Sequence, residues 1–144
     1  MRSFTSLFST TPTAEDFGKL LLRVSIGGLM LFHGVAKLIG GIPAVTEMVT
    51  SAGLPAALAY GVYVGEVIAP LLIIVGLLTR ISGLVFAVNM AMAILLGHPG
   101  QILQLGEHGE WAIELQLLYL LGALAISLLG PGKLGWGRQH GWLA

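Results

Sequence analysis

One acidic residue, Glu66, stands near the middle of the apolar run 56–78, which is long enough to cross a bilayer as a helix. A charge at the centre of a membrane span costs roughly 2.5–3.5 kcal/mol on insertion scales. Such a residue therefore faces the interior of a helix bundle or a wet cavity, where it finds a polar partner. The run predicts an integral membrane protein with a polar cluster among its helices.

The composition supports this prediction and excludes several classes of function. Of 144 residues, 56% are hydrophobic and 10% are charged, whereas a soluble domain has about 25% charged residues. Lys+Arg and Asp+Glu number seven each, so there is no basic field for a nucleic acid partner. The chain has no cysteine, which excludes disulfides and thiolate metal sites within it.

Four apolar stretches predict an all-α fold, an integral membrane four-helix bundle. Thr13 and Asp16 have the spacing of a capping box just before the first stretch. Only Thr79 and Arg80 separate the second stretch from the third, so these two should form a tight antiparallel hairpin. The predicted spans are about 18–38, 56–78, 81–97 and 111–129.

The bundle is predicted as one domain, residues 18–133, between a polar leader at 1–17 and a tail at 134–144. Between the first two spans, Pro43 is suited to start a short helix and Gly53 to end it. This helix would lie in the membrane interface. An irregular loop is the alternative.

The distribution of cations predicts that both termini are cytoplasmic. The side that holds the termini and the second-to-third hairpin collects most of the basic residues, whereas the opposite side has only Lys37 near a span end. The cations on the predicted cytoplasmic side are Arg2, Lys19, Arg80, Lys133 and Arg138.

Polar residues in the spans predict a binding or proton-relay site in the outer half of the bundle. His33 and Lys37 are four apart and share one helix face, while Arg23 lies in the inner half and Asn89 near mid-depth. The candidate site residues are Arg23, His33, Lys37, Glu66, Asn89, Glu114 and Gln116.

Structural roles are open for the same residues. Arg23 and Lys37 can snorkel to the headgroups, and Glu66 can form a structural ion pair with Arg23 or His33. The pattern Gly61-xxx-Gly65 beside Glu66 favours close helix contact, within the chain or in a homo-oligomer.

No metal or haem site is predicted. The histidine and glutamate residues after the third span match no metal-ligand spacing, and bis-histidine haem ligation would need more than the single intramembrane His33. The chain also lacks a dinucleotide-binding fingerprint. Any electrons would have to come from a partner protein.

The order of these features resembles the DoxX family of small four-helix membrane proteins. The resemblance implies a multi-pass protein of the bacterial inner membrane. The tail differs at 134–137, where many relatives are expected to have an acidic residue. The matching segments are 22–24, 27–38, 53–55, 65–67, 75–80, 114–115 and 129–133.

The family resemblance implies a link to redox chemistry, since some relatives are subunits of quinone-linked oxidoreductases such as thiosulfate:quinone oxidoreductase, and others are linked to oxidative or thiol stress. We therefore expect an accessory subunit, rather than an autonomous enzyme, that binds a quinone-like molecule and a redox partner protein within membrane lipid. The alternatives are a non-enzymatic small-solute carrier and a membrane scaffold for partner proteins.

Overall fold

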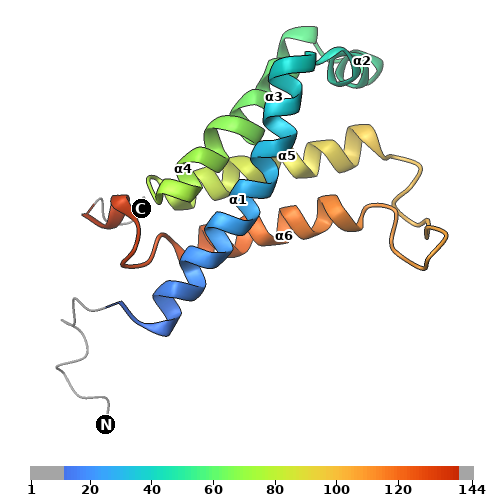
Figure 1. Ribbon diagram of the computed structural model, residues 1–144. Helices are drawn as coiled ribbons and strands as arrows, with labels where there is room; N and C mark the ends of the chain where they lie inside the picture. The colour runs from blue at the N-terminus through green and yellow to red at the C-terminus, as the bar shows by residue number, and fades with distance from the viewer. Residues whose placement is uncertain (1–11, 140–144) are drawn as a thin grey trace.

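The computed structural model describes residues 12–139, and every regular element within that range is a helix (Figure 1). The only strand-like contact there is an isolated antiparallel bridge between Leu105 and Trp111. The predicted all-α fold is thus confirmed. Most of the predicted leader, with Arg2, and the end of the predicted tail lie outside the described residues.

Three helical segments are long and apolar enough to cross a membrane: α1 (Ala14–Gly40), the segment Ala56–Val75, and α5 (Thr79–Gly97). The fourth predicted span corresponds to α6 (Glu114–Leu129), which is apolar but has only 16 residues. A spanning helix usually needs about 17–25 residues. The predicted count of four spans therefore stays a prediction.

The start of α1 follows from its capping residues. The Asp16 amide donates to Thr13 Oγ1 at 3.4 Å, and the Thr13 amide donates to Asp16 Oδ2 at 2.9 Å. This reciprocal pair satisfies donors that the first turn leaves unpaired and confirms the predicted capping box. The helix ends at Gly40, and Gly41 adopts a positive φ of 79° that turns the chain away.

The predicted short helix is present as α2 (Pro43–Ser51), with Pro43 in its first turn. A proline suits that position, because the missing N–H would have no partner in the helix. Gly53 follows the helix with a φ of 77° and redirects the chain toward the second long segment. An irregular loop, the alternative considered, is therefore wrong for this stretch.

The second long segment is not a uniform α-helix. It ends at Val75, three residues before the predicted 78, because Gly76 takes a left-handed conformation and its N–H bonds to the Leu72 carbonyl at 2.9 Å. A π-helical turn surrounds Glu66, and such turns often occur at functional sites. The elements are η2 (Ala56–Tyr60), α3 (Gly61–Tyr63), η3 (Val64–Ile68) and α4 (Ala69–Val75).

The helices pack as two pairs that cross obliquely (Figure 1). In one pair α5 lies beside α6, and in the other α1 lies beside the segment that ends in α4. Gly83 allows close approach in the first pair, because a Cβ there would lie 2.8 Å from the Ala123 carbonyl oxygen. Ile73 and Phe86 are completely buried where the pairs meet.

The chain after α6 returns to the start of α1. The Lys133 amide donates to Asp16 Oδ1 at 2.8 Å, and the tail closes with a short 3-10 helix, η4 (Trp136–Gln139). This contact places the first and last described elements at the same end of the molecule (Figure 1).

Candidate functional site

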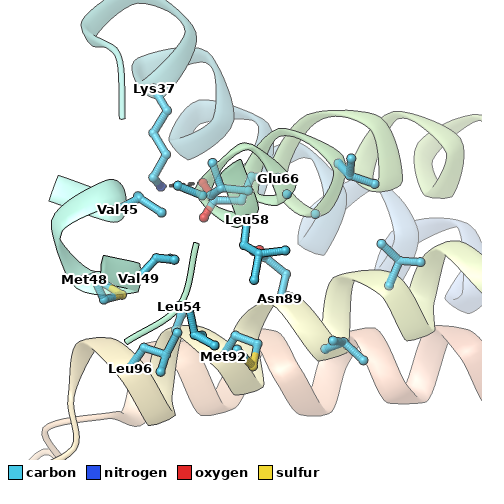
Figure 2. Close-up of a pocket in the computed structure, with 18 residues that line it drawn as sticks. Lys37, Val45, Met48, Val49, Leu54, Leu58, Glu66, Asn89, Met92 and Leu96 are labelled. Carbon is cyan, nitrogen blue, oxygen red and sulfur yellow. Dashed lines mark hydrogen bonds and ion pairs between the residues drawn. The ribbon is translucent and has the colours of Figure 1, made fainter. Parts of the chain in front are cut away.

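A cavity of about 500 Å³ lies between α2, α5 and the irregular segment around Glu66, beside the C-terminal end of α1 (Figure 2). Most of its lining is aliphatic, and three polar side chains, Lys37, Glu66 and Asn89, meet at one part of it. Ligand pockets commonly combine such an apolar wall with a few polar groups. The larger apolar side chains of the wall include Val45, Met48, Val49, Leu54, Leu58, Met92 and Leu96.

Lys37 and Glu66 form an ion pair across the gap between α1 and the π-turn, with Nζ and Oε2 2.5 Å apart. The side chain of Glu66 is 7% exposed and that of Lys37 is 27% exposed. Glu66 thus has a polar partner in the first helix, as expected. The partner is Lys37 rather than the expected Arg23 or His33, because Lys37 reaches down from the last turn of α1 (Figure 2).

Gly34 brings the backbone of α1 close enough for this pairing. A Cβ at that position would lie 2.7 Å from Val67 Cγ2 and still closer to the Glu66 carbonyl oxygen. Nearby, the Tyr63 hydroxyl donates to the Lys37 carbonyl at 3.2 Å. The π-turn and the last turns of α1 are therefore held together by backbone contact and by two polar contacts.

Asn89 comes from α5 and points into the same cavity (Figure 2). Its side chain is half-buried and packs against Gly65, next to Glu66. Among residues 12–139, it has no hydrogen-bond partner. The amide donor and acceptor are thus both available to a molecule in the cavity.

His33 does not join this group. Its side chain is exposed on α1, and its ring meets the ring of Tyr119 edge-on, with centroids 5.9 Å apart and planes at 85°. The expected placement of His33 with Glu66 is wrong, because Gly34 and Lys37, not His33, occupy the face of α1 that meets the π-turn.

Glu114 and Gln116 also lie elsewhere, at the start of α6. Glu114 is exposed, and its Oε2 accepts from the Trp111 amide at 3.2 Å. Gln116 Nε2 lies 3.1 Å from His98 Nε2, and Gln116 Oε1 is buried without a described partner. The expected single cluster of outer polar residues is therefore divided between the cavity and this second group.

Arg23 lies away from the cavity, at the C-terminal end of α4, where it makes structural contacts. It is 1% exposed, donates from Nε to the Ile73 carbonyl at 2.9 Å and from Nη2 to the Ile74 carbonyl at 3.0 Å, and donates from Nη1 to the Pro131 carbonyl. Helix C-termini leave carbonyls short of internal partners, and Arg23 donates to two of them in α4, of which the Ile73 carbonyl also accepts from the Gly76 amide at 3.1 Å. It neither snorkels to the headgroups nor reaches the cavity.

The apolar wall contributed by α2 was not identified from the sequence as part of the site. The signal existed, since Val45, Met48 and Val49 repeat at helical spacing and share one face. That face packs inward over the cavity. In the part of the chain that the structure describes, no three His, Cys, Asp or Glu side chains gather as metal ligands.

Two comparisons with known proteins bear on this site. The sequence profile of the DoxX family matches residues 18–99, more than half of the chain and all three polar cavity residues. A protein of Bacillus subtilis (strain 168) named "Putative oxidoreductase CatD" is 38% identical over 80 residues, which are 56% of this chain and 59% of that protein. The chain therefore aligns with less than two thirds of this relative. No solved structure matches.

Proposed function

The chain belongs to the DoxX family and is a multi-pass membrane protein, and we propose that it is a small accessory subunit of a quinone-linked oxidoreductase or redox-stress complex. In this proposal a quinone-like molecule binds in the cavity beside Lys37, Glu66 and Asn89. The observation that carries the proposal is the cavity itself, about 500 Å³ of mainly aliphatic lining with three polar side chains gathered together.

The chemistry of the lining suits a quinone. A quinone has an apolar body with carbonyl oxygens at its head, and Lys37 and Asn89 supply N–H donors for those oxygens. Reduction of a quinone consumes protons as well as electrons, and Glu66, paired with Lys37, can relay a proton to the quinone oxygen. A partner protein would supply the electrons, since the sequence has no cysteine and no dinucleotide-binding fingerprint. The name of the Bacillus subtilis relative is consistent with an oxidoreductase setting.

We further propose that α6 completes four crossings, with both termini cytoplasmic and the cavity in the outer half of a bacterial inner membrane. The contact between Asp16 and Lys133 supports an even number of crossings, because it joins the start of α1 to the turn after α6. The cations Lys19 and Lys133 lie at that end, whereas Lys37 lies toward the other.

Reporter fusions test this topology. Alkaline phosphatase should be inactive and a fluorescent protein bright when fused after Ala144, and the pattern should reverse for fusions within the loop after Gly100. An active phosphatase together with a dark fluorescent protein after Ala144 would contradict the orientation.

Ligand binding tests the function. Purified protein in lipid nanodiscs is titrated with decyl-p-benzoquinone, with empty nanodiscs as the blank. We expect Glu66→Gln to weaken binding by about ten- to a hundredfold, because it removes the charge-assisted bond that holds the Lys37 donor beside the cavity, and such a bond contributes about 1.5–3 kcal/mol. His33→Ala is the matched control and should bind like the parent, since His33 lies outside the cavity.

Two results would count against the proposal. Equal binding by the parent and Glu66→Gln would remove the site. A parent that binds no quinone, and from which mass spectrometry finds no co-purified quinone or redox protein, would favour the carrier or scaffold hypothesis instead.

A further inference from the structure

Asn89 is the one polar side chain of the cavity whose hydrogen-bonding groups have no partner among residues 12–139. Lys37 and Glu66 pair with each other, whereas the Asn89 amide points into the cavity beside them (Figure 2). An unpaired amide against aliphatic walls carries a free-energy cost. That cost is offset when a ligand or water supplies the missing hydrogen bonds.

Gly65 provides the space in which Asn89 sits. A Cβ at position 65 would lie 2.7 Å from Asn89 Oδ1 and closer still to the Asn89 Cβ and Cγ. Gly61 is one turn earlier and also lines the cavity, but a Cβ there would meet nothing within 4 Å. The two glycines of the small-residue pattern therefore differ: a side chain is tolerated at 61 and displaces Asn89 at 65.

The ion pair next to Asn89 favours a ligand head without charge. Lys37 and Glu66 neutralise each other at 2.5 Å. An anionic head would compete for Lys37 and leave the Glu66 carboxylate, whose side chain is 7% exposed, without its partner. A cationic head would likewise displace Lys37 from Glu66. An uncharged head can bind beside the intact pair.

We infer that Asn89, which sits in the space that Gly65 leaves, is the specificity-determining residue of this cavity. Its amide hydrogen-bonds to a carbonyl or hydroxyl oxygen on an uncharged ligand head. The inference rests on the proposed function, because it assumes that the cavity is a binding site. Asn89 Nδ2 can donate to a carbonyl, and Oδ1 can accept from a hydroxyl. One side chain thus serves the oxidised and the reduced form of a quinone.

The test uses three probes in lipid nanodiscs: decyl-p-benzoquinone, its hydroquinone under anaerobic conditions, and decylbenzene, which lacks the oxygens. Asn89→Leu should weaken binding of both oxygenated probes by about three- to tenfold, as expected for one lost hydrogen bond. Its binding of decylbenzene should not change. Asn89→Asp keeps an acceptor but, when ionised, has no donor, so it should weaken quinone binding more than hydroquinone binding.

Gly65→Ala and Gly61→Ala form a matched pair that tests the space around Asn89 independently. Gly65→Ala should reproduce the loss seen with Asn89→Leu, and Gly61→Ala should bind like the parent. If Gly65→Ala does not fold, the two Asn89 variants still decide the result, because leucine and aspartate keep the branched shape of the asparagine side chain that packs against Gly65.

The outcomes separate the inference from the function on which it rests. Unchanged quinone binding by Asn89→Leu, while Glu66→Gln is impaired, would overturn the role of Asn89 and leave the quinone site in place. A parent that binds neither oxygenated probe above empty nanodiscs would overturn both. Two charged probes, decanoate and decyltrimethylammonium, are titrated in the same way, and tighter binding of either than of the quinone would overturn the selection of an uncharged head.

Discussion

Arg23 and Glu66 are both charged groups buried among apolar helices, yet their surroundings differ. Arg23 is 1% exposed, and each of its three guanidinium nitrogens donates to a backbone carbonyl. Glu66 is held by one side chain, Lys37, and borders a cavity of about 500 Å³. A buried charge in a membrane helix is thus an ambiguous signal of function. Its partners, and the space beside it, distinguish a structural role from a binding role.

The difference between these regions has a physical origin in the helices that supply the partners. Arg23 meets the C-terminal end of α4, where helix geometry leaves carbonyls free for an outside donor. Glu66 lies in a π-turn between two other helical stretches, beside a helix, α2, that covers the cavity with aliphatic side chains. We call the region around Arg23 the arginine end and the region around Glu66 the cavity end. Substitution of the buried charge should lower stability but not binding at the arginine end, and should weaken binding at the cavity end.

The largest expected effect is at the arginine end. Arg23→Leu should lower the free energy of unfolding by about 3–5 kcal/mol, because it leaves buried carbonyls without donors. Arg23→Lys should recover only part of the loss, since one ammonium cannot reproduce the geometry of the guanidinium. Unfolding in mixed micelles measures this, and quinone binding per folded molecule should not change. An Arg23→Leu protein that is stable but has lost quinone binding would contradict the structural role assigned to Arg23.

The next largest effect is expected at Gly34, where the backbone of α1 closely approaches that of Glu66 beside the cavity. Gly34→Ala should destabilise by about 1–3 kcal/mol, because the new methyl group would overlap the Glu66 backbone and cannot be accommodated by a simple side-chain rotation. Gly28→Ala is the matched control on the same helix, where a Cβ meets nothing within 4 Å. It should be neutral or stabilising, since alanine favours a helix over glycine. Equal unfolding curves for the two variants would contradict this reading of Gly34.

Local sequence patterns predicted part of this arrangement. The helical fold, the cap at Thr13 and Asp16, and the start of α2 at Pro43 depend on neighbouring residues and are confirmed. The need of Glu66 for a partner in the first helix also followed from its position in an apolar run, because the cost of an unpaired charge there is large.

Other features depend on contacts that no local pattern contains. Arg23 bonds to carbonyls 50 and 108 residues away. Whether Lys37 or His33 pairs with Glu66 depends on which face of α1 meets the π-turn. No sequence pattern predicted that turn. Helical periodicity gives relative directions along one helix but not the rotation of that helix against its neighbour. The site could therefore be predicted as a set of candidates, but not as the group of three that shares the cavity.

A smaller effect should appear where the tail meets the arginine end. Asp16→Asn weakens the acceptor that holds both the Thr13 amide and the Lys133 amide. We expect a thermal midpoint lower by a few degrees and severalfold faster tryptic cleavage after Lys133. Glu15→Gln is the control, because Glu15 is 75% exposed and, among residues 12–139, pairs only with Lys19 at the surface, where such pairs contribute little. Faster cleavage in the control alone would assign tail docking to a different contact.

The smallest effect is predicted at the cavity end, for Tyr63→Phe. The change removes one hydrogen bond, from the Tyr63 hydroxyl to the Lys37 carbonyl at 3.2 Å, and retains the ring. Because Lys37 is partly exposed in the last turn of α1, water or a lipid headgroup can replace the lost donor, and the cost should be about 0.5 kcal/mol. Tyr60→Phe is the control, since Tyr60 is 65% exposed and its hydroxyl has no described partner. A loss for Tyr63→Phe as large as that for Arg23→Leu would show that the cavity end is as tightly determined as the arginine end, and would remove the distinction between them.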